Sequence, residues 1–482
     1  MSVDLNQAMS RARDLVSGQA FGSDGFFEGM ELLNDQARSG SVEANVLLGH
    51  LHCQYPGLPD APAKAHEYYQ EAVSLGDPLA LLRLADLAMF GYGQERNDVE
   101  AFDHITSLAA GGYASALCQQ ALMISQGIGC KRDDQRAASL VLQAAAQGDT
   151  LAFALLAERY LDGLGVPQRP DLASAWLALA CRRQFPGAER RRQQLTKQVS
   201  STEADEGRRW AEKLMDNIRG LGPAVAQMGI PEHHPEYPKR FASVVAENFA
   251  RLDEPALSLD AAQRGMGAIA PQQPLLVPQA VSWSPRVFQV DRFADAQERL
   301  YLLAAATGSL VSSAGQQVTE NAAEVDPFDG ECAVFSPQLV SPIVRIIQRR
   351  WAHVLHIHEQ HFEPMSVLRY SRGHEYSPHV DYFDANRIKA HREIGDLGGQ
   401  RLITGLIYLI ASEEGGETTY GDQGPTIRGQ DGSAVFHFNT RVDGLVDAQS
   451  VHAGRPVTTG EKWLCRTAVR ENNVYLNRET VL

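Results

Sequence analysis

The sequence predicts a multidomain protein in which an N-terminal α-helical repeat solenoid precedes an α+β domain. Glycine and alanine recur at a constant interval of 36 residues over roughly the first two hundred positions, which is the signature of a repeat array. Short β-type runs separated by glycine-rich turns dominate the C-terminal part. A chain of 482 residues is also too long for one ordinary hydrophobic core.

The repeat is visible at several independent positions. An alanine follows four residues after each of the periodic glycines, and a Gly-x-Gly element and a second alanine keep the same 36-residue step. The periodic glycines are Gly40, Gly76, Gly112 and Gly148. Between them, apolar helical stretches flank a Gly/Pro turn, which is typical of a helix hairpin. One hairpin cannot bury its apolar face alone, so neighbouring hairpins are expected to stack.

These features resemble Sel-one-like repeats, which are relatives of the tetratricopeptide repeats. We assign the repeats to residues 1–195, with a less regular cap at the start, and a helical segment and linker to 196–280. The resemblance implies a concave surface that binds a protein or peptide. The alternative is a scaffold that only supports the next domain, because nothing in the repeats identifies a ligand.

The C-terminal part, residues 281–482, is expected to be an antiparallel sandwich or barrel with helices beside it. Two stretches, 296–306 and 342–355, have helical patterns. The expected strands are "PRVFQV", "SVLRYS", "LITGLIYLI", "SAVFHFN" and "KWLCRTAV".

One of the short runs, "YSPHVDYF", contains a histidine and an aspartate two residues apart. Side chains alternate along a strand, so His379 and Asp381 are expected on one face, where both can bind one metal ion. The pair alone is a weak signal. Beyond His391, the remaining histidines are His437 and His452, and Lys462 follows the second by ten residues.

Two histidines and one carboxylate form the facial triad of non-haem iron(II) sites, which leaves coordination positions open. A 2-oxo acid can occupy two of these positions and oxygen a third. The distal carboxylate of such a cosubstrate needs a buried cation, which Lys462 can supply.

Residues of about 284–475 resemble the prolyl 4-hydroxylase branch of the 2-oxoglutarate- and iron(II)-dependent dioxygenases. The motifs "VLRYSRGHEYSPHVDYF", "GGQRLITGLIYL", "EEGGETTY", "GSAVFHFN" and "VHAGRPVTTGEKW" follow in the order of that family. The resemblance implies a double-stranded β-helix (jelly-roll) fold. It also implies Fe(2+), 2-oxoglutarate and O2, and allows for ascorbate as a further cofactor.

Position by position, the resemblance implies that His379, Asp381 and His452 are the catalytic iron ligands. It implies that Lys462 binds the 5-carboxylate of 2-oxoglutarate.

The resemblance extends to the surroundings of the ligands. It implies that Tyr370 donates a second hydrogen bond to the cosubstrate and that Thr418 lies nearby. Tyr376 and Arg401 match positions that contact the substrate peptide. At the position of Ala468 the family often carries a tryptophan near the substrate. The smaller alanine is expected to change the shape of the substrate pocket, so the residue that is hydroxylated need not be proline.

The other histidine groups have less specific patterns. "HVLHIHEQH" is similar to a zinc-protease motif, but His358 and His361 are three residues apart rather than four, so a helix end and a polar connection are expected. His233 and His234 are expected in a solvated loop, and His437 as a satisfied core or rim histidine.

Composition limits the choice of partners. The net charge of −15 argues against nucleic acid, and no apolar run is long enough for a transmembrane helix. The N-terminal residues lack a signal-peptide pattern, so a cytoplasmic location is expected, with six cysteines that are reduced and buried.

We therefore expect a dioxygenase of the procollagen-proline 4-dioxygenase type, which hydroxylates a peptidyl proline in a protein recruited by the repeats. Two alternatives stay open. The same chemistry could act on another residue or a small molecule, or the repeats could serve as an adaptor beside an inert oxygenase fold.

Overall fold

The computed structural model describes residues 2–18, 22–55, 57–219, 276–313, 328–335, 341–383, 399–472 and 474. Most of the predicted linker, from 220 to 275, lies outside the described residues, as do His233 and His234.

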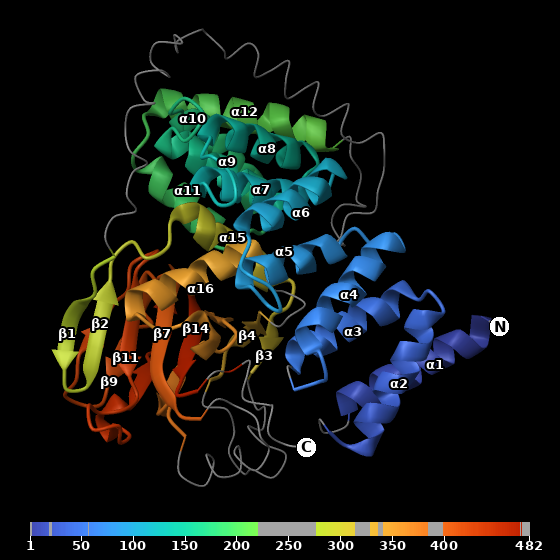
Figure 1. Ribbon diagram of the computed structural model, residues 1–482. Helices are drawn as coiled ribbons and strands as arrows, with labels where there is room; N and C mark the ends of the chain where they lie inside the picture. The colour runs from blue at the N-terminus through green and yellow to red at the C-terminus, as the bar shows by residue number, and fades with distance from the viewer. Residues whose placement is uncertain are drawn as a thin grey trace.

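In the N-terminal part, antiparallel helix hairpins stack side by side in a curved array that runs from α1 to α12 (Figure 1). Its helices are α1 (Ser2–Gly18), α2 (Asp24–Arg38), α3 (Val42–Gln54), α4 (Ala61–Ser74), α5 (Ala80–Phe90), α6 (Asp98–Ala110), α7 (Ala114–Gln126), α8 (Asp134–Ala146), α9 (Thr150–Asp162), α10 (Pro170–Arg182), α11 (Ala188–Thr196) and α12 (Ser201–Arg219). The predicted helical solenoid is confirmed.

The periodic glycines lie at the turns between helices, where the backbone needs a positive φ. The four glycines of the first series all have φ values between 81° and 101°. The second glycine of the Gly-x-Gly element recurs for a further reason, which is the lack of space for a side chain. A Cβ on Gly165 would lie 1.8 Å from the carbonyl oxygen of Asp134, at the start of α8, so only glycine lets consecutive hairpins approach this closely.

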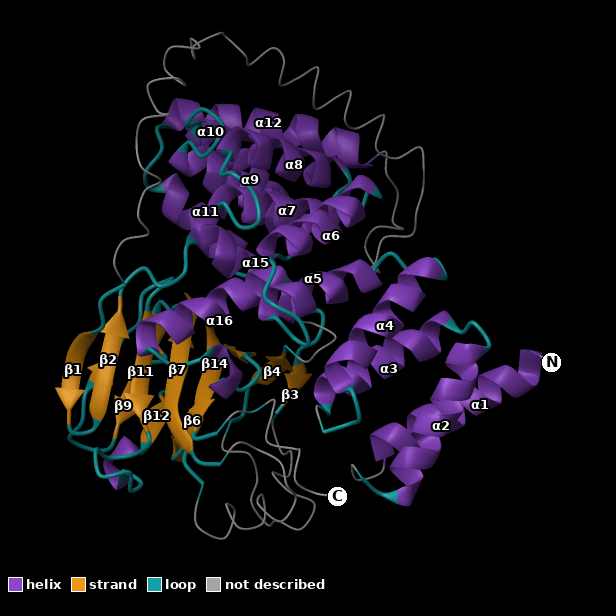
Figure 2. Cartoon of the chain, viewed as in Figure 1, coloured by secondary structure: helices purple, strands orange, loops and turns teal. Residues whose placement is uncertain are grey.

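The C-terminal part contains two facing antiparallel sheets (Figure 2). The large sheet has the order β1-β2-β11-β7-β14-β5-β4-β3, and a smaller sheet has the order β10-β9-β12-β6. A third, two-stranded sheet pairs β13 with β8. Such a pair of stacked antiparallel sheets is the jelly-roll arrangement.

The strands are β1 (Gln279–Trp283), β2 (Arg286–Val290), β3 (Val311–Ser312), β4 (Glu331–Val334), β5 (Ser366–Tyr370), β6 (Tyr376–His379), β7 (Arg401–Ile410), β8 (Glu414–Gly415), β9 (Thr418–Tyr420), β10 (Thr426–Ile427), β11 (Ala434–Phe438), β12 (His452–Gly454), β13 (Val457–Thr459) and β14 (Lys462–Arg470). The helices of this part are α15 (Ala296–Thr307) and α16 (Pro342–Leu355), with short 3₁₀ turns η3 (Glu359–His361) and η4 (Ala448–Ser450). The five expected strands and both expected helices are present.

Helix α16 covers the outer face of the large sheet and separates it from the repeats (Figure 1). Its Trp351 is fully buried and packs on Gly405 of β7, where an added Cβ would lie 2.9 Å from the indole ring. Because no side chain stands at Gly405, the helix can lie close to the sheet. On the opposite side, α16 contacts α5 and α7 of the repeats.

Two ion pairs, one buried and one partly exposed, join the two parts at α16. Arg345 donates to Asp86 of α5 at 2.7 Å, with each side chain only 9% exposed. Arg349 pairs with Asp98 of α6 at 2.7 Å. One hydrophobic core runs continuously from the repeats through α15 and α16 into the large sheet.

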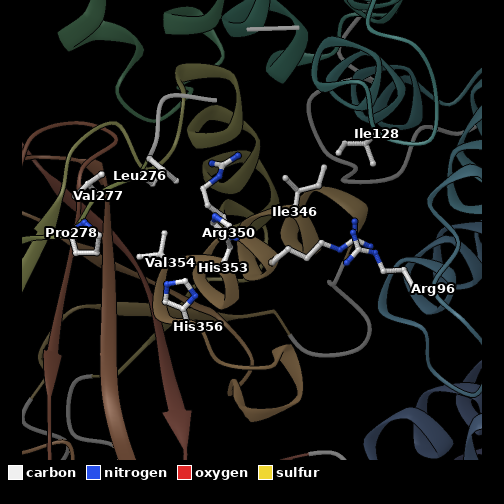
Figure 3. Close-up of a pocket in the computed structure, with 11 residues that line it drawn as sticks. Arg96, Ile128, Leu276, Val277, Pro278, Ile346, Arg350, His353, Val354 and His356 are labelled. Carbon is white, nitrogen blue, oxygen red and sulfur yellow. The ribbon is translucent and has the colours of Figure 1, made fainter. Parts of the chain in front are cut away.

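A cavity of about 480 Å³ lies at this junction, between α16, the first residues before β1 and the loops of the repeats (Figure 3). Its lining includes Arg96, Ile128, Leu276, Ile346 and His353. It contains none of the predicted site residues.

The structure bears on two expectations from composition, concerning transmembrane helices and cysteines. In the parts of the chain that the structure describes, no helix is long and apolar enough to span a bilayer. None of the six cysteines, all of which lie in described segments, is in a disulfide, but only Cys118 and Cys465 are buried, so the expectation that all six are buried is wrong. The other four, Cys53, Cys130, Cys181 and Cys332, are only partly buried.

Candidate active site

Three predicted metal ligands meet between the two sheets. His379 at the end of β6 and His452 at the start of β12 are direct partners in neighbouring antiparallel strands. One ligand atom from each of these histidines and from Asp381 can be chosen so that all three lie within 4.8 Å of one another. Among the described residues, this is the cluster suited to a metal ion.

The prediction that strand alternation orients Asp381 is wrong. Strand β6 ends at His379, and Asp381 lies in the bend that follows, so strand alternation does not place it. Instead the chain turns after His379, and Arg466 of β14 holds one oxygen of the Asp381 carboxylate at 3.1 Å. The side chains still converge, but through a turn and an ion pair.

The two histidines are oriented in the same way. His379 Nδ1 lies 2.8 Å from the carbonyl oxygen of Ser377, and His452 Nδ1 lies 3.0 Å from that of Ser450. A carbonyl oxygen can only accept, so each Nδ1 carries the hydrogen and each Nε2 presents a lone pair. Burial lowers the pKa of His379 to about 3, which keeps this ring neutral.

Asp381 is ionised although it is buried. Burial alone would raise its pKa, but the positive charge of Arg466, followed by smaller contributions from the nearby histidines, holds that pKa well below its ordinary value. Its Oδ2 atom has no hydrogen-bond partner among the described residues. An unpartnered carboxylate oxygen in a buried place is costly unless a ligand completes it.

Lys462 is the second unpartnered charge of the site. Its side chain is 1% exposed, and Nζ makes no hydrogen bond to any described residue. Burial lowers the pKa of Lys462 to about 7, an effect that Glu417 only partly opposes. The rings of Tyr370 and Tyr408 lie nearby, with centroids 4.8 Å and 5.8 Å from Nζ.

The metal cluster and Lys462 line one cavity between the sheets. Tyr370, Tyr376 and Thr418 line it as well. Tyr376 stacks on His379 with ring centroids 3.7 Å apart and an interplanar angle of 15°. The rest of the lining is Leu368, Leu406, Gly454, Leu464 and Arg466.

Arg401 does not line this cavity. Its guanidinium forms two hydrogen bonds with Glu363, at 2.7 Å and 3.0 Å, and stacks over Phe383. Its contact with a substrate stays a prediction. Ala468 is buried in β14 opposite Thr404 of β7, so the place of the expected tryptophan is occupied by a small side chain.

Sequence reasoning missed Tyr408, whose hydroxyl is 2.9 Å from Thr418 Oγ1. Because side chains alternate along a strand, Tyr408 lies on the same face of β7 as Leu406, which lines the cavity. His437 was expected to be satisfied, and this is only half correct. Its Nδ1 is 3.0 Å from the hydroxyl of Tyr420, but its Nε2 has no hydrogen-bond partner among the described residues.

These residues fit a divalent iron ion and a dicarboxylate cosubstrate. Two neutral imidazoles and one carboxylate with an open oxygen form the donor set that iron(II) oxygenases use. A buried ammonium group without a partner fits the far carboxylate of the cosubstrate. The leucine side chains between them suit its aliphatic carbons.

Comparisons with known proteins match both parts of the chain. Residues 365–470 match the 2OG-Fe(II) oxygenase superfamily, and residues 42–77, 78–113, 114–149 and 152–185 match the Sel1 repeat. The C-terminal part is 30% identical over 205 residues to probable prolyl 4-hydroxylase 3 of Arabidopsis thaliana, covering 38% of this chain and 69% of that protein. It is 32% identical to prolyl 4-hydroxylase 1 of the same plant, covering 40% and 72%.

Solved structures were also compared. The viral collagen prolyl hydroxylase from Paramecium Bursaria Chlorella virus-1, in its 2OG complex, is 25% identical, covers 38% of this chain and 94% of that chain, and has a TM-score of 0.30. A Sel1 repeat protein from Oxalobacter formigenes is 24% identical, covers 51% and 72%, and has a TM-score of 0.33. On the sequence matches, this chain belongs to the prolyl 4-hydroxylase-like 2-oxoglutarate- and iron(II)-dependent oxygenases and carries Sel1 repeats in its N-terminal part.

Proposed function

We propose that the C-terminal domain hydroxylates a peptidyl proline in a protein that the repeats recruit. The observation that carries this proposal is the combination of a buried His-Asp-His cluster and an unpartnered lysine in one cavity. The names of the Arabidopsis relatives support proline as the target.

In this proposal His379, Asp381 and His452 hold the iron, and Lys462 binds the 5-carboxylate of 2-oxoglutarate. When bound, iron(II) supplies oxygen activation coupled to the conversion of 2-oxoglutarate into succinate and carbon dioxide. The protein contributes the rest. Lys462 and the leucines that line the cavity would orient the cosubstrate.

Three neighbouring side chains would assist. In this proposal Thr418, with its hydroxyl next to that of Tyr408, would contact the cosubstrate carboxylate, and Tyr370 lies beside the lysine. Tyr376, stacked on His379, lies at the wall where a substrate would approach the metal.

The test uses a proline-rich, collagen-like peptide with the full chain, iron(II), 2-oxoglutarate and air. Succinate release and a one-oxygen mass gain on proline are expected for the wild type, and neither for His379→Ala. The matched control is His104→Ala, a histidine of α6 in the repeats, which should behave like the wild type. Equal turnover in the wild type and His379→Ala would exclude the oxygenase reading.

Ala468 supports a second candidate substrate, which is a residue other than proline or a small molecule. Where relatives often place a large ring, this chain has a buried small residue beside Thr404, which favours a pocket of different shape. Peptides that contain other residues at the central position, and free amino acids, should therefore be assayed in parallel. A one-oxygen gain on these and not on proline would replace proline as the substrate.

Recruitment by the repeats has its own experiment. Proteins crosslinked to the full chain are digested and examined for one-oxygen gains on proline, with and without 2-oxoglutarate. Recruitment of substrate predicts gains that depend on 2-oxoglutarate in the crosslinked proteins. Crosslinked proteins without such gains would leave the repeats as a scaffold or an adaptor for another purpose.

A further inference from the structure

His437 lies next to the metal cluster, on the large sheet that faces the ligand histidines of the small sheet. In the small sheet, His379, His452 and Tyr420 are neighbours in register across β6, β12 and β9. His437 reaches toward them from β11 of the large sheet and is fully buried. Its ring centroid is 4.5 Å from that of His452.

The hydrogen bond to Tyr420 determines which nitrogen of His437 carries the hydrogen. Among the described residues, the Tyr420 hydroxyl has His437 Nδ1 as its partner, at 3.0 Å. If Nδ1 carried the hydrogen, the buried hydroxyl would lose its acceptor, and Nε2 would direct a lone pair at a carboxylate. The favourable arrangement therefore has the hydroxyl donating to Nδ1 and the hydrogen on Nε2.

This arrangement is the reverse of that in the two ligand histidines. In His379 and His452, Nδ1–H donates to a backbone carbonyl oxygen and Nε2 carries a lone pair. In His437, Nε2 is a donor, and it lies 3.7 Å from Asp381 Oδ2. Both atoms are buried and neither has a hydrogen-bond partner among the described residues. The distance is slightly longer than a hydrogen bond, and a small rotation of either side chain closes it.

We propose that His437, oriented by Tyr420, is a positioning residue that donates its Nε2–H to Asp381 and, with Arg466, holds this carboxylate in place for the metal. The proposal rests on the proposed function, since Asp381 is the ligand whose direction it explains. A carboxylate with a donor at each oxygen cannot rotate, and each oxygen still has a lone pair for the ion.

The experiment measures Mn(II) binding to the full chain, by paramagnetic resonance titration, in the wild type and four variants. His437→Phe removes the donor, and its dissociation constant should rise about 10- to 100-fold. His437→Gln returns an N–H near the Nε2 position and should recover most of the affinity. Tyr420→Phe should weaken binding by a smaller factor, and this factor should vanish in the His437→Phe background, because the hydroxyl acts through the ring.

Two results would overturn the proposal. Wild-type affinity in His437→Phe would mean that the ring only fills space, and additive losses from His437→Phe and Tyr420→Phe would mean that the two residues do not act in series. Thermal melting of each variant identifies loss of folding, and His437→Gln, which keeps a polar side chain at the site, supplies the comparison if His437→Phe does not fold.

The visible spectrum of the Co(II)-substituted protein separates positioning from direct ligation. Unchanged band positions in His437→Gln, at saturating Co(II), support a residue outside the coordination sphere. A changed coordination spectrum would make His437 a fourth ligand and contradict the proposal. The proposed function fails separately: a wild type that binds Mn(II) and shows the His437 effects but hydroxylates no proline leaves this inference standing.

Discussion

The junction at α16 and the cavity between the sheets both bury charged side chains, but they treat these charges differently. At the junction, Arg345 faces Asp86, and Arg350 faces Glu298 at 2.6 Å, so each charge has its opposite. In the cavity, Lys462 Nζ and Asp381 Oδ2 have no hydrogen-bond partner among the described residues.

This difference separates structure from function. A buried charge without a partner is expensive, so its presence indicates that something else completes it. At the junction the partners belong to the chain, and the result is a firm connection between the repeats and the oxygenase domain. In the cavity the missing partners correspond to a cation and a carboxylate, which are the chemical groups of the proposed iron and cosubstrate.

The largest effect is expected at the junction. Asp86→Ala leaves Arg345 buried without its carboxylate, so the free energy of unfolding should fall by about 3–5 kcal/mol. Urea unfolding of the full chain measures this change. Hydroxylation of a short peptide should persist in the folded variant, because the cavity is built from the other side of the large sheet.

Two controls sharpen the comparison. Arg441→Ala breaks an exposed pair with Asp443 and should leave stability at the wild-type value. The double change Asp86→Leu and Arg345→Leu removes both charges and should be far less damaging than Asp86→Ala alone. If the single change costs nothing, the junction pair does not hold the two parts together.

The same kind of change in the cavity should have the opposite effect on stability. Lys462→Met removes a buried ammonium that has no partner, so the free protein should become more stable, by about 1–3 kcal/mol. Binding of 2-oxoglutarate should weaken by about 2–5 kcal/mol, which is at least roughly 30-fold. Unfolding in urea and anaerobic calorimetric titration measure the two quantities. Loss of stability without loss of binding would make Lys462 a structural residue.

The pH dependence follows from the same lysine. Burial lowers the pKa of Lys462 to about 7 in the free protein, so the ammonium form prevails only below that pH. Because the cosubstrate carboxylate needs the ammonium, the KM for 2-oxoglutarate should be level below about pH 7 and rise up to tenfold per pH unit above it.

Lys462→Arg provides the control, because a guanidinium stays charged throughout this range. Its KM, although higher than that of the wild type, should not change between about pH 6 and pH 9. A flat profile for both proteins would show that Lys462 does not titrate in the free enzyme or does not bind the cosubstrate.

Sequence reasoning predicted the repeats and the main strands because both rest on local, periodic signals. A 36-residue period in glycine and alanine reflects the close approach of each such turn to the preceding hairpin, as at Gly165. The nearly continuous apolar runs of β7 and β14 reflect burial of both faces of these central strands. These patterns can be read from one chain without knowing its partners.

The details of the site depended on contacts between distant segments. The direction of Asp381 comes from Arg466, 85 positions later, and not from a strand. The half-satisfied state of His437 depends on Tyr420 and on the packing of one sheet against the other. Neither contact leaves a mark in the local sequence pattern, so neither could be predicted from it.

The smallest effect is expected where the cavity already has an internal partner. Tyr408 and Thr418 share a hydrogen bond of 2.9 Å, so this part of the wall is satisfied without a ligand. Tyr408→Phe removes one neutral hydrogen bond, and 2-oxoglutarate affinity should fall only about two- to tenfold, corresponding to about 0.5–1.5 kcal/mol.

A double-mutant cycle with Thr418→Val, read by 2-oxoglutarate titration, decides whether the pair acts as a unit. If Tyr408 serves to orient Thr418 toward the cosubstrate, the loss from Tyr408→Phe should disappear once Thr418 is replaced. Additive losses would mean that each side chain contacts the cosubstrate independently. A loss as large as that of Lys462→Met would break the comparison itself, because a satisfied polar pair would then matter as much as an unpartnered charge.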